Sequence, residues 1–193
     1  MKNIAIFVSG GGTDMQSVID ACERGEINGR ICAVIANKSG IYAIDRAVKH
    51  GIPYRIFTIK EYGDAENRDK AIADYLSSLD IDLIVLAGYL SIVTSSLLDI
   101  YEGRIINIHP SLIPAYCGMG MYGMRVHRAV IEGGEMESGC TVHYVDGGAD
   151  TGKIIEQVKV KVLAGDTPES LQERVLEQEH ILLPKVVAQL CRE

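Results

Sequence analysis

Short apolar runs alternate with longer segments of helical periodicity along the first part of the chain. The apolar runs, which indicate buried strands, lie at 4–8, 31–35, 54–59, 81–87 and 104–109. Apolar residues spaced three and four apart predict amphipathic helices at 15–24, 42–50 and 65–79. Such an alternation of strand and helix is typical of an α/β protein with a doubly wound, mostly parallel sheet.

The pattern changes in the last third of the chain. Two strands are predicted at 140–145 and 154–162, on either side of a turn-rich segment, and the second alternates apolar and polar residues as an edge strand does. A long helix is predicted from Pro168 to about residue 191, with Thr167 as its N-cap and a kink at Pro184. We therefore expect one domain with an antiparallel C-terminal edge and a long C-terminal helix.

Composition narrows the class of protein further. The 193 residues are 47% hydrophobic, and 26 acidic against 19 basic side chains give a net charge of −7. This acidic balance argues against nucleic-acid or membrane-surface partners, which require a basic face. The five cysteines are odd in number and form no CxxC pair, which favours reduced thiols in a cytoplasmic protein over disulfides or a zinc site.

A glycine loop, Ser9-Gly10-Gly11-Gly12-Thr13-Asp14, lies between the first strand and the first helix. The Thr13–Gln16 spacing predicts a capping box, with free N–H groups suited to a phosphate. A P-loop is excluded, and so is a dinucleotide site, because Met15 stands where a third glycine is needed. One phosphate is therefore expected, with Lys38 as a candidate cation; a tight turn without a ligand is the alternative.

Asn107 and His109 are the strongest catalytic candidates in the chain. They project to the same side of a predicted strand that ends at Pro110. An amide and an imidazolium can both donate to a developing oxyanion, and a carboxylate would keep the ring charged. Asp146 and Asp150 are both candidates for that carboxylate, and spacing alone does not separate them. The alternative is a buried structural histidine with aspartates that only form turns.

These residues belong to a set of motifs that resembles the phosphoribosylglycinamide formyltransferases, within the folate-dependent formyltransferase family. The matching blocks, in chain order over essentially the whole length, are 9–13, 86–89, 107–114, His127, 139–143, 150–152 and 178–180. The N-x-H-P-S-L-x-P block followed by D-x-G is specific to folate-dependent formyltransferases and their relatives, and the glycine loop and the short acidic chain narrow the resemblance to the purine-pathway member. The resemblance implies a Rossmann-like formyltransferase fold over residues 1–193, with a phosphate-binding half at about 1–100 and a folate-binding, catalytic half at about 101–193.

The resemblance also implies a reaction and a set of site residues. A formyl group would pass from 10-formyltetrahydrofolate to the amine of glycinamide ribonucleotide, in purine biosynthesis, with no metal. Asn107 and His109 would hold the oxyanion, and Asp150, rather than Asp146, would support His109 and relay a proton. The remaining residues match three substrate-binding regions: the phosphate site at Gly11, Gly12, Thr13 and Asp14, the amine end at Glu179, and the folate pocket at Leu90, Ser91, Ile92, Val93, Val145 and Asp146.

Three features depart from the family pattern. Asp14 stands where Asn is more usual, Ser91 where some members have Arg, and the segment 117–124 is rich in glycine and methionine, as a mobile loop over the folate site would be. His143 is expected to support the site rather than react. A formyl-folate hydrolase and a non-catalytic phosphate-binding protein are the rival functions, and a monomer and a homodimer are both compatible with the sequence.

Overall fold

The computed structural model describes residues 1–192 and contains a seven-stranded sheet in the order β3-β2-β1-β4-β5-β6-β7. Strands β1 to β5 are parallel, and β6 and β7 continue the sheet in antiparallel pairing. The strands are β1 (Lys2–Val8), β2 (Gly29–Ala36), β3 (Tyr54–Ile56), β4 (Leu83–Leu86), β5 (Ile105–His109), β6 (Glu137–Tyr144) and β7 (Ile154–Lys161). The sequence-based fold class is confirmed.

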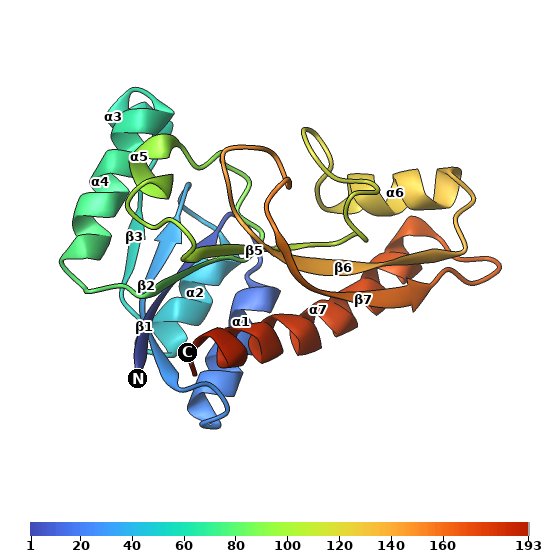
Figure 1. Cartoon of the computed structure of the whole chain (residues 1–193), viewed down its shortest axis with the longest axis horizontal. Helices are drawn as coiled ribbons and strands as arrows, with labels where there is room; N and C mark the ends of the chain where they lie inside the picture. The colour runs from blue at the N-terminus through green and yellow to red at the C-terminus, as the bar shows by residue number, and fades with distance from the viewer. Residues whose placement is uncertain (193) are drawn as a thin grey trace.

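Helices cover both faces of this sheet. They are α1 (Thr13–Glu23), α2 (Tyr42–Lys49), α3 (Ile59–Tyr62), α4 (Ala65–Ser77), α5 (Ser95–Leu98), α6 (Met124–Glu132) and α7 (Pro168–Leu190). The helix α7 packs beside α1 and along β6 and β7, which extend beyond the parallel strands (Figure 1). The predicted long C-terminal helix is therefore confirmed, and it continues through Pro184.

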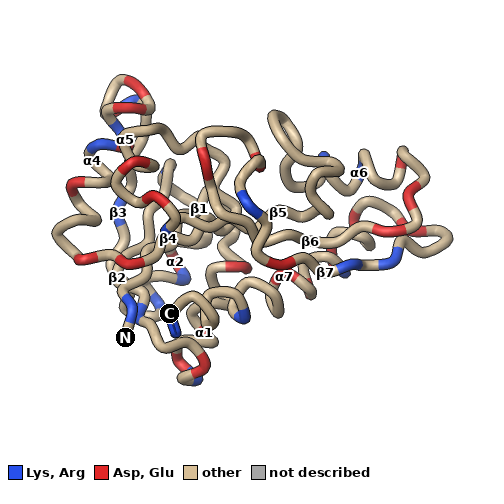
Figure 2. Tube along the Cα trace, in the orientation of Figure 1, with Lys and Arg blue, Asp and Glu red and all other residues tan. Residues whose placement is uncertain are grey.

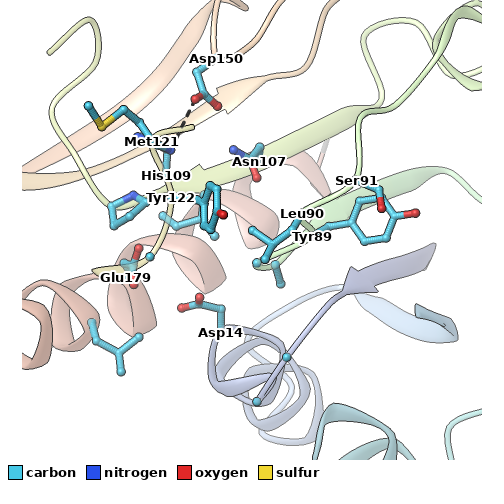
Figure 3. A pocket seen from close by; sticks show the side chains of 18 of the residues that line it. Asp14, Tyr89, Leu90, Ser91, Asn107, His109, Met121, Tyr122, Asp150 and Glu179 are labelled. Carbon is cyan, nitrogen blue, oxygen red and sulfur yellow. Dashed lines mark ion pairs between the residues drawn. The ribbon is translucent and has the colours of Figure 1, made fainter. Parts of the chain in front are cut away.

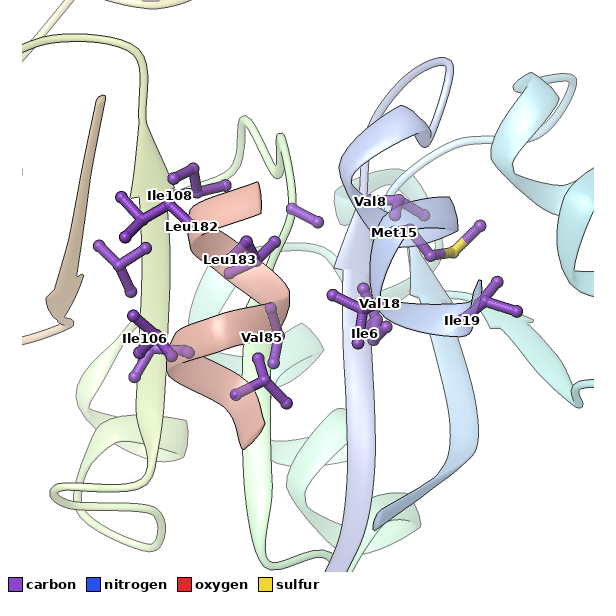
Figure 4. Packing of buried hydrophobic residues seen from close by; sticks show 14 of the residues in the cluster. Ile6, Val8, Met15, Val18, Ile19, Val85, Ile106, Ile108, Leu182 and Leu183 are labelled. Carbon is purple, nitrogen blue, oxygen red and sulfur yellow. The ribbon is translucent and has the colours of Figure 1, made fainter. Parts of the chain in front are cut away.

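Two hydrophobic cores lie on opposite faces of the sheet. On β1, Ile4, Ile6 and Val8 enter the core under α1, α2, α6 and α7, while Ala5 and Phe7 enter the core under α4 and α5. The first core is seen in Figure 4, where side chains of α1 and α7 pack onto β1, β4 and β5. Burial on both faces explains why these strands are continuous apolar runs in the sequence.

Several predicted boundaries were wrong. The predicted strand 54–59 ends at Ile56, because Thr58 caps α3 by accepting a hydrogen bond from the Glu61 backbone N–H at 3.1 Å. The helices α3, α5 and α6 were not predicted; α3 and α5 are too short to show a period. The predicted strand 81–87 is shortened to β4, and β6 begins three residues before the predicted 140.

The predicted capping box at the start of α1 was also wrong. The residue before the helix is Gly12, in the left-handed region at φ 71° and ψ 31°, and no side chain caps it. The Gln16 side chain instead donates to Asp20 at 2.8 Å. Because Thr13 is already the first helical residue, its hydroxyl is not placed as a cap. The helix nevertheless begins at Thr13, as the sequence indicated.

Candidate active site

A cavity of about 640 Å³ opens at the carboxyl ends of β1, β4 and β5. This is the end of a parallel sheet at which α/β proteins bind ligands. Its walls come from the glycine loop, the segment after β4, the loop 118–123 and the inner side of α7 (Figure 3). A second cavity of about 290 Å³ adjoins it and shares Asn107 and Asp150. Elements far apart in the sequence therefore meet in one bipartite site.

Asn107 lies on β5, directly opposite His143 on β6. The amide nitrogen of Asn107 is 3.1 Å from His143 Nε2, and His143 Nδ1 is 2.8 Å from the carbonyl oxygen of Tyr144. A carbonyl only accepts, so His143 donates from Nδ1, and its Nε2 faces both the Asn107 amide and the Asp150 carboxylate. The contact with His143 thus fixes the Asn107 amide and leaves its second N–H for a substrate oxygen. His143 orients Asn107, in agreement with its expected supporting role.

Asp150 reaches His109 and His143 from the loop between β6 and β7. Its carboxylate lies 3.6 Å from His109 Nδ1 and 3.5 Å from His143 Nε2, and it accepts a hydrogen bond from the Gly118 backbone N–H at 2.9 Å. Burial opposes ionisation, but the contacts with His143, Gly118 and His109 outweigh it and lower the pKa of Asp150 below its usual value. Asp150 is therefore an anion at neutral pH, placed beside the imidazole.

The two ring nitrogens of His109 have different surroundings. Nε2 donates to the carbonyl oxygen of Tyr116 at 3.0 Å, whereas the 3.6 Å gap from Nδ1 to Asp150 is too long for a hydrogen bond. Nδ1 is therefore the nitrogen free to contact a water or a reacting oxygen. The ring is 4% exposed and lies near His127, whose pKa is lowered to about 4 by burial and by His109. His127 is thus neutral and does not compete for the carboxylate.

The glycine loop forms the opposite wall of the main cavity. The N–H groups of Thr13, Asp14 and Met15 precede the first intrahelical hydrogen bond, from Gln16 N to Gly12 O at 2.9 Å, and have no helical acceptor. Gly11 and Gly12 bring this backbone to the cavity surface. Arg46 supports the loop through a 2.9 Å hydrogen bond to the Gly11 carbonyl. Lys38 is exposed and is not among the cavity-lining residues.

Asp14 and Glu179 bring two carboxyl groups into the same part of the cavity (Figure 3). Glu179 is 7% exposed, and Asp14 Oδ1 is enclosed without a hydrogen-bond partner among residues 1–192. Burial raises the pKa of Asp14 to about 7. Burial, and then the charge of Asp14, raise the pKa of Glu179 well above its usual value. The pair therefore retains at least one proton near neutral pH.

The residues expected at the folate pocket lie in both cavities. Leu90, Ser91 and Ile92 line the main cavity; Ser91, Ile92, Val93, Val145 and Asp146 line the adjoining one. This wall is fixed by a buried ion pair that the sequence did not reveal. Arg68 donates to the Ile92 carbonyl at 2.7 Å, and Asp69 accepts from the Thr94 N–H at 2.7 Å. Both side chains are 1% exposed, so the clamp is rigid.

Apart from Lys38, every residue predicted for the site thus lies at one of two adjoining cavities. Sequence reasoning missed the contributions of Gln172 and Leu176, which line the main cavity from α7. Leu176 lies four residues after Gln172 and three before Glu179, so the three side chains share one helix face. This spacing was visible in the sequence. No cluster of three potential metal ligands occurs within residues 1–192, and no helix in that range is long and apolar enough to cross a membrane.

The chain belongs to the formyl transferase family, whose model matches residues 2–187. Among the relatives, a phosphoribosylglycinamide formyltransferase of Haemophilus influenzae is 43% identical over 97% of this chain and 86% of its own length. A chloroplastic phosphoribosylglycinamide formyltransferase of Arabidopsis thaliana is 39% identical, and this chain spans 66% of its length.

Solved structures extend the comparison to three dimensions. Glycinamide ribonucleotide transformylase 1 from Geobacillus kaustophilus superposes with a TM-score of 0.93 at 38% identity and covers 99% of both chains. The corresponding protein from Symbiobacterium toebii gives a TM-score of 0.94 at 37% identity and covers all of this chain and 88% of the other. The architecture, including the antiparallel edge and α7, is therefore that of these transformylases.

Proposed function

We propose that the protein transfers the formyl group of 10-formyltetrahydrofolate to the amine of glycinamide ribonucleotide. The observation that carries this proposal is that Asn107 and Asp150 line both cavities and His109 lines the main one beside them. The glycine loop offers backbone donors for a phosphate at one end. The clamped wall at 90–94 and the segment at 145–146 offer a pocket for the folate at the other. The two proposed substrates are both small molecules.

The proposed chemistry passes through a tetrahedral oxyanion. The neutral amine attacks the formyl carbon, and the carbonyl oxygen becomes negative as the new C–N bond forms. The second N–H of Asn107 and Nδ1–H of protonated His109 would stabilise that oxygen. Asp150 would accept the amine proton through a water, and a proton would reach the folate nitrogen as its C–N bond breaks. One proton leaves the amine and one is gained by the folate, so the transfer is balanced.

The two halves of the chain would divide this task. The phosphate end of the nucleotide would lie on residues from about 1–100, chiefly Gly11, Gly12, Thr13 and Asp14. The catalytic residues would come from about 101–193, and the folate pocket would be shared, with residues 90–93 from the first half and Val145 and Asp146 from the second. Glu179 on α7 would lie near the amine end of the nucleotide, since it lines the same cavity as Asn107 and His109.

An absorbance assay of folate deformylation tests the proposal. Turnover is expected with 10-formyltetrahydrofolate only when glycinamide ribonucleotide is present. Equal turnover without the amine would instead identify a formyl-folate hydrolase. Binding of the nucleotide without turnover would identify the non-catalytic phosphate-binding alternative.

A further inference from the structure

The main cavity has an unusual charge for a site that would receive a phosphate. Its carboxyl and imidazole side chains within residues 1–192 are Asp14, Asp150, Glu179, His109 and His127, and none of its lining residues is Lys or Arg. Lysines and arginines are scattered over other elements of the chain (Figure 2). A phosphate dianion in this cavity would therefore meet carboxyl groups, with backbone N–H groups as its main attraction.

Asp14 is the group closest to the proposed phosphate position. It is the second residue of α1, so its own N–H is one of the free donors at the helix start. Its side chain is 15% exposed, and Oδ1 has no hydrogen-bond partner among the described residues. An ionised carboxylate here would repel the phosphate, whereas a protonated one would donate a hydrogen bond to it.

The neighbours of Asp14 do not neutralise it. The titratable and charged groups around it come from α7, β6, β5, α6 and α2: Glu179, His180, Cys140, His109, His127 and Arg46. His180 Nε2 is 3.7 Å from Asp14 Oδ1, beyond hydrogen-bond distance, and burial lowers the pKa of His180. Burial raises the pKa of the Cys140 thiol to about 12, so it carries no charge. Arg46 is engaged by Gly11 and Gln16.

We infer that Asp14 and Glu179 act as one proton-carrying unit, so that the phosphate-bearing substrate binds together with a proton. This inference rests on the proposed function. The proton on the pair lets Asp14 act as a donor beside the backbone N–H groups and removes a negative charge from the cavity. The complex with the phosphate substrate therefore forms when the pair carries its proton. The affinity for that substrate falls as the pair loses the proton.

Calorimetry of glycinamide ribonucleotide binding tests this inference directly. Titrations at pH 8, in two phosphate-free buffers with different enthalpies of ionisation, give the number of protons taken up per substrate bound. The wild-type protein is expected to take up more protons than the double variant D14N/E179Q. The matched control D45N removes an exposed carboxylate from α2, outside the cavity, and should keep the wild-type value.

The pH dependence of affinity provides a second measurement. One linked proton makes the wild-type dissociation constant rise by up to about tenfold per pH unit above pH 7. D14N should bind about as tightly as wild type at pH 6 and roughly tenfold more tightly at pH 8.5, because one repulsive charge is gone. E179Q should change the affinity in the same direction, which keeps the test valid if the double variant does not fold.

The outcomes separate the two hypotheses. If the wild-type protein bound no glycinamide ribonucleotide at pH 6 or at pH 8.5, the proposed function would be overturned, and this inference with it. Binding with equal proton uptake in wild type and D14N/E179Q would overturn the inference alone. A larger uptake in wild type, retained in D45N, would establish the pair as the carrier of the proton.

Discussion

Asp150 occupies a backbone conformation that few side chains adopt. Its φ of 59° lies in the left-handed region, which Asp and Asn tolerate better than other non-glycine residues. Asp146 is nearer in sequence to the end of β6 than Asp150 is. Its carboxylate accepts hydrogen bonds from the Gly148 N–H and the Thr151 hydroxyl, so it is engaged within the loop. The choice between the two aspartates, which spacing left open, has this local geometric basis.

The variant D150N should lower kcat for formyl transfer by roughly 10²- to 10⁴-fold, because it removes the charge beside His109 and the proton acceptor. The nucleotide KM should change little. Steady-state rates by the absorbance assay measure both. D146N is the matched comparison, and its effect should fall on the folate KM. Equal losses of kcat in the two variants would contradict the assignment of Asp150.

Stability should depend on pH through Asp14. Its pKa rises from 3.8 when unfolded to about 7 in the fold, so the folded state holds the proton more tightly. The free energy of unfolding therefore falls as pH rises from 4 to 7, by on the order of a few kcal/mol. D14N should be more stable than wild type at pH 8, by roughly 1–3 kcal/mol, and similar at pH 4.

Urea unfolding at the two pH values measures this difference. D45N, which loses an exposed carboxylate, should show no comparable gain at pH 8. A D14N protein with the same pH dependence as wild type would show that the carboxyl group of Asp14 is not held in its buried position in solution.

At the scale of elements, the glycine loop is shaped by its contact with α2. A Cβ on Gly12 would lie 2.7 Å from the Cβ of Ala43, and its φ of 71° is itself unfavourable for other residues. The backbone N–H of Ala43 also donates to the Gly10 carbonyl at 3.1 Å. The position of the free N–H groups of α1 is thus set by a neighbouring helix as well as by the loop sequence.

The variant G12A should destabilise the protein by roughly 1–3 kcal/mol and raise the nucleotide KM, because the loop must move away from α2. G10A is the matched control, since a Cβ there meets no atom within 4 Å. Chemical denaturation and steady-state kinetics report the two effects. If G10A and G12A were equally destabilised, the contact with Ala43 would not be the cause.

Much of this fold was predictable because the buried strands are long apolar runs and the main helices have clear periods. The site was predictable where one motif carries it, as Asn107 and His109 do on a single strand. The Arg68–Asp69 clamp and the proximity of Asp14 to Glu179 were not, because they join segments separated by many residues. Pairings of that kind depend on tertiary packing, which local pattern does not encode.

At the scale of the whole molecule, substrate binding should stabilise the fold. The main cavity joins the start of α1, the ends of β4 and β5, and the side of α7, so a ligand there bridges elements that are far apart in the sequence. At a concentration of 100 times its Kd, glycinamide ribonucleotide should add about 2.7 kcal/mol to the free energy of unfolding.

This gain corresponds to a rise in Tm of roughly 2–4 °C per kcal/mol for a chain of this size. Differential scanning calorimetry measures it, and the corresponding riboside without phosphate should give a smaller rise at the same concentration. Equal rises with both compounds would argue against a phosphate site at the glycine loop.

The loop that carries Asp150 has a consequence for how this scaffold can diversify. Its two ends are tied together, since the Tyr144 N–H donates to the Lys153 carbonyl at 2.9 Å. Changes between these ends would leave the hairpin in place, except at Gly152, where a Cβ would collide with the Tyr144 carbonyl oxygen. The group that faces His109 could then be exchanged within this loop, while the strand that carries the imidazole stays the same.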